Sequence, residues 1–334
     1  MPKFKVLCLD GGGIKGTFTA AVLTGLEEML GSPIVPYFDL IVGTSTGGII
    51  ALALGLGLRA EEILHFYEKH GPTIFPSTGV HRRAGLFLKG LVRPKHSSEV
   101  LRERLVEVFR DRRLGEAVTR LAIPCFDCNA GRIQMFKTAH HERFVHDYKV
   151  AVVDVALATS AAPTYFSAFN TVDGQSFLDG GVWANCPVMV GLLEAMYVLD
   201  ISSPDIHVLS VGTTDDPFDV SKIKRIGGLL TWGTTAVSLL MRAQTDAAIS
   251  QAQLVLGDRL LRVDSVTRPG RFTLDDSRRI SDLVGLGKFT AKDRFEVVAE
   301  RFLGSTVTPF QPNHILSPAN QVPEALRNYK FMGH

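Results

Sequence analysis

Short apolar runs alternate with segments of helical periodicity along most of the sequence. Apolar runs of strand length occur at residues 4–9, 38–42, 121–127, 132–138 and 206–211. Apolar residues recur every three or four positions at residues 17–30, 48–54, 60–70, 98–110, 152–160, 187–199 and 229–256. This alternation predicts an α/β fold, a three-layer sandwich in which helices cover both faces of a mainly parallel central sheet.

Glycine and proline mark the expected ends of these elements. Gly31 should end the helix of residues 17–30, and Gly71-Pro72 should end the helix of residues 60–70. No linker interrupts the pattern before about residue 305. From Gly304 the chain becomes polar and rich in proline. We therefore expect one domain over residues 1–305, followed by a tail or surface wrap over residues 306–334.

Composition narrows the class of protein further. The chain has 334 residues, 46% hydrophobic and 21% charged, which is a globular balance. A net charge of +2 gives no field that would favour a DNA or RNA polymer as partner. Four cysteines do not form a disulfide framework in a chain of this length, and Cys125 and Cys128 are expected to be buried thiols rather than zinc ligands.

The start of the chain and its most apolar stretch bear on location. Residues 1–9 run straight into a strand pattern without a signal peptide, and residues 41–58 are too short and too broken by glycine for a confident membrane span. We therefore expect a cytoplasmic protein whose membrane contact is peripheral, on the inner membrane.

The first candidate for chemistry is Ser45, within Gly43-Thr44-Ser45-Thr46-Gly47. This G-x-S-x-G motif lies between a predicted strand and a predicted helix, the context of a nucleophile elbow. Gly43 and Gly47 allow the flanking backbones to pack closely, and the amides of the following helix can stabilise developing negative charge. The alternative is a turn without chemistry.

A second glycine-rich turn, Asp10-Gly11-Gly12-Gly13-Ile14-Lys15-Gly16, also joins a strand to a helix. Its exposed amides could form an oxyanion hole. Gly11, Gly13 and Gly16 also match a dinucleotide fingerprint, but no acidic residue follows at the end of the second strand. A phosphate-binding P-loop would need the lysine after the glycine, whereas Lys15 precedes Gly16. A turn that binds nothing is the remaining alternative.

Asp179-Gly180-Gly181 follows a short apolar run. Taken alone, Asp-Gly is one of the commonest turn dipeptides, and the structural interpretation is favoured over a functional one.

Together, in this order, the three motifs resemble the patatin-like phospholipase family. The resemblance extends to residues 160–166 (SAAPTYF) and 182–187 (VWANCP), and covers residues 4 to about 215. It implies a patatin-like fold and a Ser–Asp pair that hydrolyses lipid acyl esters without a metal or cofactor. Ser45 matches the nucleophile and Asp179 the base. Gly11, Gly12 and Gly13 match the oxyanion loop, and Lys15 its basic position.

The same resemblance bears on the ten histidines. A Ser–His–Asp triad would be the usual expectation for G-x-S-x-G, but no histidine lies in a motif of similar quality. A carboxylate is a weak base at its ordinary pKa near 4, so burial, or desolvation by the bound substrate, would have to strengthen Asp179. One departure from the family pattern is Cys186, where a second asparagine is more usual.

A narrower resemblance concerns regulation. Residues 9–16, 38–41 and above all 66–75 (FYEKHGPTIF) resemble the phospholipase effectors of the cyclic-oligonucleotide anti-phage systems of bacteria (CBASS). This resemblance implies activation by a cyclic dinucleotide of the cGAMP type, followed by degradation of the cell's own membrane phospholipids. We also expect a homo-oligomer.

The binding site for such a nucleotide stays open. The segment 71–95 contains no acidic residue and carries several cations, and Lys222, Lys224 and Arg225 form a second basic group. Either could bind nucleotide phosphates, anionic lipid headgroups, or only water. Two other hypotheses are an ungated acyl hydrolase of lipid turnover and a non-catalytic nucleotide sensor using residues 11–16.

Overall fold

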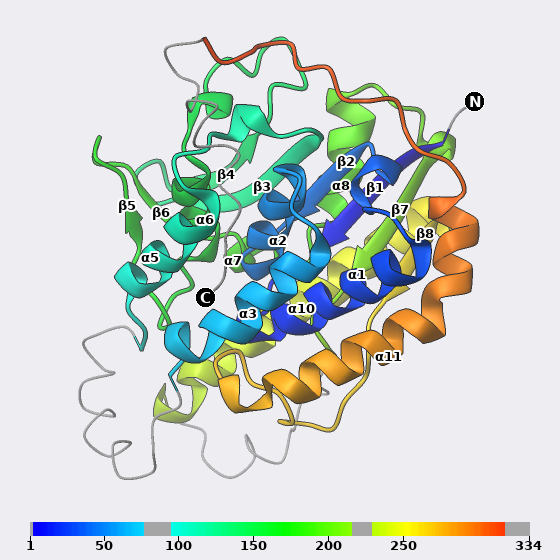
Figure 1. The fold of residues 1–334 in the computed structure, drawn as a ribbon. Helices are drawn as coiled ribbons and strands as arrows, with labels where there is room; N and C mark the ends of the chain where they lie inside the picture. The colour runs from blue at the N-terminus through cyan, green and yellow to red at the C-terminus, as the bar shows by residue number, and fades with distance from the viewer. Residues whose placement is uncertain (1–2, 77–94, 216–228, 318–334) are drawn as a thin grey trace.

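The computed structural model describes residues 3–76, 95–215 and 229–317 (Figure 1). The central sheet follows the order β5-β6-β3-β2-β1-β7-β8, with β4 paired to β3. Its strands are β1 (Phe4–Leu9), β2 (Leu40–Gly43), β3 (Arg120–Asp127), β4 (Arg132–Lys137), β5 (Phe169–Asn170), β6 (Ser176–Asp179), β7 (Ile206–Val211) and β8 (Leu260–Val263).

Five neighbouring strands, from β3 through β2, β1 and β7 to β8, are parallel. The antiparallel strands β4, β6 and β5 extend this sheet at one side. The mainly parallel sheet predicted from the sequence is therefore confirmed.

Alternate residues of the central strands enter two different cores. Leu7 and Leu9 of β1 face the larger core, whereas Val6 and Cys8 face the smaller one. The larger core includes side chains from the helices α1 (Gly16–Leu30), α2 (Thr46–Gly55), α3 (Ala60–Ile74), α5 (Ser98–Phe109), α6 (Val152–Ser160) and α11 (Ile280–Val298). The smaller core includes α7 (Gly181–Ala184), α8 (Val188–Leu193) and α10 (Leu229–Leu256). Figure 1 shows helices on both faces of the sheet, which confirms the predicted sandwich.

Two local predictions need correction. Helix α3 continues through Gly71-Pro72 to Ile74. Pro72 removes only one backbone hydrogen bond, and the Phe75 amide still donates to the Gly71 carbonyl (2.8 Å), so the last turn of the helix is kept. Cys125 is buried as expected, but Cys128 is exposed because it follows β3 at the hairpin turn.

The start of the predicted tail contacts the domain. The Val307 amide donates to the Pro36 carbonyl (2.8 Å), the Asn313 amide donates to the Ala139 carbonyl (2.7 Å), and Leu316 is buried. Among the helices that the structure describes, none is long and apolar enough to cross a membrane.

Candidate active site

Ser45 occupies the sharp turn between β2 and α2. Its backbone has φ 55° and ψ −122°, a conformation that costs about 1–3 kcal/mol and persists only where the surroundings enforce it. The Ser45 amide donates to the Thr159 hydroxyl (3.0 Å), and the Ser45 carbonyl accepts from the Ile49 amide (3.0 Å). A side chain at Gly47 would overlap the Leu9 carbonyl, so only glycine allows this close approach. The turn therefore has the geometry of a nucleophile elbow.

Strand pairing brings Asp179 beside Ser45. Strand β4 occupies one edge of β3, and the other edge is shared: β2 pairs with Arg120–Ala122, and β6 pairs with Cys125–Asp127. Because β6 takes over where β2 ends, the last residue of β6 lies next to the turn that follows β2. The Ser45 hydroxyl donates to Asp179 Oδ2 at 2.7 Å, although 134 residues separate the two in sequence.

The other oxygen of Asp179 is also held. The Gly181 amide donates to Asp179 Oδ1 at 2.6 Å, and the Gly180 amide donates to the Thr159 carbonyl at 3.2 Å. The Thr159 hydroxyl in turn donates to the Pro124 carbonyl at 2.6 Å. Thr159 thus connects both halves of the site through its side chain and its backbone. This role could not be predicted from the sequence, where Thr159 is marked only by its position in a helix before the family motif.

Burial changes the acidity of Asp179. The carboxyl is 2% exposed, and this desolvation raises the pKa of Asp179 to about 7, even though hydrogen bonds from Ser45 and Gly181 act in the opposite direction. A carboxylate with a pKa near 7 is a stronger base than an ordinary aspartate and is still about half ionised at neutral pH. Burial, one of the two effects expected to strengthen this residue as a base, is present.

The glycine turn of residues 11–13 lies next to Ser45. The position that a side chain would occupy at Gly11 is 3.3 Å from Ser45 Cβ. The Gly11 amide, however, donates to the Asn185 carbonyl at 2.9 Å. This corrects the prediction for Gly11, because an amide that already serves the scaffold is not free for an oxyanion.

Gly12 and Gly13 remain as candidate donors. Neither amide bonds to an acceptor among the described residues, and Gly13 lines the cavity at Ser45. Gly13 has φ +57°, and the Ile14 amide that follows is fixed by the Leu274 carbonyl (2.9 Å). Lys15 Nζ donates to the Thr214 carbonyl (3.2 Å), and Gly16 packs against Thr46. Lys15 and Gly16 therefore support the turn.

A partly buried ionic cluster underlies this turn. Arg262 of β8 donates to Asp10 Oδ2 and to Asp264 Oδ2, both at 2.6 Å, and to the Ser210 hydroxyl at 2.7 Å. Cys186, the departure from the family pattern, lies 3.8 Å from the same guanidinium. Arg262 was not predictable as a site residue, because nothing near it in the sequence forms a motif.

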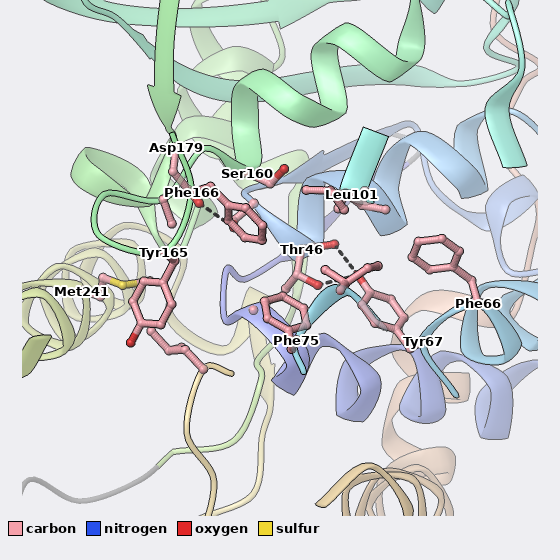
Figure 2. Close-up of a pocket in the computed structure, with 16 residues that line it drawn as sticks. Thr46, Phe66, Tyr67, Phe75, Leu101, Ser160, Tyr165, Phe166, Asp179 and Met241 are labelled. Carbon is pink, nitrogen blue, oxygen red and sulfur yellow. Dashed lines mark hydrogen bonds between the residues drawn. The ribbon is translucent and has the colours of Figure 1, made fainter. Parts of the chain in front are cut away.

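Ser45 and Asp179 line an apolar cavity. Its volume is about 630 Å³, part of which is open to solvent. Apolar and aromatic residues dominate the lining, which includes Ile49, Phe66, Tyr67, Ile74, Phe75, Leu101, Tyr165, Phe166 and Met241. Figure 2 shows Asp179, Tyr165 and Met241 towards one end and Phe66 at the other. Such a lining suits a long hydrocarbon group.

No histidine among the described residues lines this cavity or bonds to either Ser45 or Asp179. The buried His140 instead bonds to Glu194 at 2.9 Å, which is a structural role. Within residues 3–76, 95–215 and 229–317, no three His, Cys, Asp or Glu side chains are placed to hold a metal ion.

The basic groups singled out in the sequence fall mostly outside the described residues. This applies to residues 77–94 and to Lys222, Lys224 and Arg225. From the end of the first group, Lys95 lies 3.5 Å from Asp275 and 4.6 Å from the centre of the Tyr165 ring.

An α/β fold that carries a nucleophile elbow, a buried carboxylate on its serine and an apolar cavity defines a serine acyl hydrolase. Comparison with known families agrees, because the model for patatin-like phospholipases matches residues 7–192. The chain belongs to the patatin-like phospholipase family.

Individual relatives cover most of the chain. A "cGAMP-activated phospholipase" of Pseudomonas aeruginosa (strain BWHPSA011 / Pa011) is 35% identical over 97% of this chain and 98% of its own. A protein of the same name from Vibrio cholerae is 33% identical over 75% of this chain and 76% of its own. "Patatin-like protein 1" of Arabidopsis thaliana is 29% identical over 86% of this chain and 80% of its own.

Proposed function

We propose that this chain hydrolyses acyl ester bonds of membrane phospholipids with Ser45 as nucleophile and Asp179 as general base. The observation that carries the proposal is the 2.7 Å hydrogen bond from the Ser45 hydroxyl to Asp179, both of which line an apolar cavity. A phospholipid offers what such a site needs, an ester carbonyl attached to a long hydrocarbon chain.

The first half of the reaction forms an acyl-enzyme. Ser45 Oγ attacks the ester carbonyl while its proton passes to Asp179 Oδ2. The amides of Gly12 and Gly13 stabilise the oxyanion, a contribution worth roughly 100- to 1000-fold in rate for each such donor. As the tetrahedral intermediate collapses, Asp179 returns the proton to the departing alcohol oxygen of the lysophospholipid.

The second half releases the fatty acid. A water molecule gives a proton to Asp179 and attacks the ester of the acyl-enzyme. Collapse of this second intermediate returns the proton from Asp179 to Ser45 and frees the fatty acid, which then loses its own proton to water. Asp179 thus acts first as base and then as acid in each half.

A cyclic dinucleotide of the cGAMP type is the proposed activator. The names of the relatives from Pseudomonas aeruginosa and Vibrio cholerae support this part of the proposal. The segment with the strongest resemblance to anti-phage effectors, residues 66–75, also contributes Phe66, Tyr67, Ile74 and Phe75 to the cavity wall. We infer an anti-phage effector that acts as a homo-oligomer in the cytoplasm and degrades the host's inner membrane.

The test is release of fatty acid from vesicles of phosphatidylethanolamine and phosphatidylglycerol, measured with and without a panel of cyclic dinucleotides. Hydrolysis should require one of the nucleotides, and Ser45→Ala should abolish it. Ser250→Ala, which removes an exposed hydroxyl from α10, is the control and should retain full activity. If Ser45→Ala hydrolyses vesicles as fast as the parent protein, the proposed nucleophile is wrong.

The same assay addresses the alternative of an ungated hydrolase of lipid turnover, because full activity without nucleotide would remove the activation step and leave the chemistry. A non-catalytic nucleotide sensor at residues 11–16 is disfavoured by packing. The space beside Gly12, where a side chain would stand, is filled by Thr213, and Lys15 Nζ donates to the Thr214 carbonyl.

A further inference from the structure

Helix α10 lies against the turn that follows Asp179. Three of its side chains, at positions 241, 244 and 245, contact the segment 181–185. Gln244 Nε2 donates to the Val182 carbonyl at 2.7 Å, and Asn185 Nδ2 donates to the Thr245 hydroxyl at 3.1 Å. Met241 Cε lies 3.5 Å from the position that a side chain would occupy at Gly181, and Met241 also lines the cavity. Positions three and four apart share one face of a helix, so this face of α10 is the one that meets the turn.

The segment held by α10 carries groups that fix both parts of the catalytic site. At its start, the Gly181 amide donates to Asp179 Oδ1 at 2.6 Å. At its end, the Asn185 carbonyl accepts from the Gly11 amide at 2.9 Å, next to the proposed oxyanion donors. Only the single turn of α7 separates these two contacts. A displacement of this segment would therefore move the base and the glycine turn together.

The contacts of α10 change in character along its length. Near its C-terminus, Ala252 and Leu256 are fully buried in the smaller core, with Ala248 and Ile249 packed beside them. Beside the active site, hydrogen bonds from Gln244 and to Thr245 are added to the apolar contact of Met241. Apolar packing holds the helix without fixing its exact rotation, whereas hydrogen bonds depend on distance and direction. The two polar contacts are therefore suited to set the position of the turn.

We propose that Gln244 and Thr245 are positioning residues, through which α10 holds the Asp179 turn and the glycine turn in the geometry required for hydrolysis. The inference rests on the proposed roles of Ser45 and Asp179. Both residues lie beyond residue 192, where the match to the family model ends, so a part of the chain outside that match would contribute to the reaction.

The test compares Thr245→Val, which keeps the shape and removes the hydroxyl, with Thr245→Ser, which keeps the hydroxyl. Ser250→Ala on the exposed side of the same helix is the control. Two readouts are measured on the purified full-length chain. The first is vesicle hydrolysis with cGAMP, as kcat and KM separately and as a function of pH. The second is amide hydrogen exchange of peptides that contain Gly11 and Gly181.

Thr245→Val should lower kcat roughly 3- to 10-fold, the loss of about one hydrogen bond, with KM within about twofold of the parent value. Because the Gly181 bond lowers the pKa of Asp179, loosening it should move the acidic limb of the profile to higher pH. Exchange at both peptides should become faster. Thr245→Ser should restore kcat to within about twofold.

Three results would overturn the inference: Thr245→Val that matches Ser250→Ala in kcat and exchange, a loss that Thr245→Ser does not restore, or an effect confined to KM. If the parent protein itself fails to hydrolyse vesicles, the proposed function fails instead, and the hydrogen-exchange comparison decides whether α10 holds the two turns.

Discussion

Replacing Asp179 with asparagine is expected to stabilise the fold at neutral pH while it abolishes hydrolysis. Asparagine has the shape of aspartate, its carbonyl can accept from the Gly181 amide, and its amide group can donate to Ser45. The substitution therefore removes a buried charge and leaves the packing in place. A base is lost, but no cavity is created.

The size of the effect follows from the pKa of Asp179, which burial raises from 3.8 to about 7. Below pH 4 the carboxyl is protonated in both the folded and the unfolded chain, so its ionisation costs nothing. Between pH 4 and 7 only the unfolded chain ionises, and stability falls as pH rises. Above pH 7 the cost is complete at about 4 kcal/mol, because each pKa unit corresponds to about 1.4 kcal/mol. Asparagine never ionises and avoids this cost.

Urea denaturation of both proteins between pH 4 and 8, followed by tryptophan fluorescence, measures the difference. The advantage of Asp179→Asn should be small at pH 4 and should grow by about 4 kcal/mol by pH 8. Asp173→Asn, at an exposed position, is the control and should show no such growth. An advantage that does not change with pH, or a variant less stable than the parent at pH 8, would refute the reasoning.

Three further predictions concern the cavity and its surroundings. Hydrolysis by the parent protein should fall about tenfold for each pH unit below 7 and level off above it, because only ionised Asp179 acts as base; a profile flat down to pH 5 would contradict the raised pKa. Phe66→Ala should shift the preference of the enzyme towards longer acyl chains, since Phe66 lies at the far end of the cavity. Hydrolysis rates for a series of esters with acyl chains of about eight to eighteen carbons measure this preference, and rates that depend on chain length as in the parent protein would count against that role. Arg262→Met should destabilise the fold by about 3–5 kcal/mol in urea, because it leaves the buried Asp10 and the half-buried Asp264 without their cationic partner, whereas a loss below about 1 kcal/mol would show that the cluster is not stabilising.

The central helices and strands of the fold could be predicted from the sequence. β1, β7, α6 and α10 lie at the predicted residues because short apolar runs and helical periodicity are local signals. No prediction was made for residues 257–303, where β8 and α11 form. β8 is only four residues long and includes the charged Arg262. α11 contains Gly285 and Gly287, which weaken a helical pattern. Gly287 is required by tertiary contact, because a side chain there would meet Ala21 of α1.

The candidate site shows the same division between local and distant information. The elbow at Ser45 was predictable because strand, turn and helix are consecutive in sequence. The placement of Asp179 depends on β6 joining the same edge of β3 as β2, and the use of the Gly11 amide depends on Asn185. Neither contact is a property of its own segment. The family resemblance supplied the role of Asp179, and only the fold supplies the distance.

The residues of the catalytic site lie far apart in the sequence, so they are synthesised at different times. Ser45 leaves the ribosome 134 residues ahead of Asp179, and the glycine turn gains its contact with the Leu274 carbonyl later still. A nascent chain therefore exposes the serine long before it can assemble the pair that would activate it. Fragments that end before Leu274 lack part of the support of the glycine turn, so a ribosome that stalls before this residue releases a polypeptide with an incomplete catalytic site.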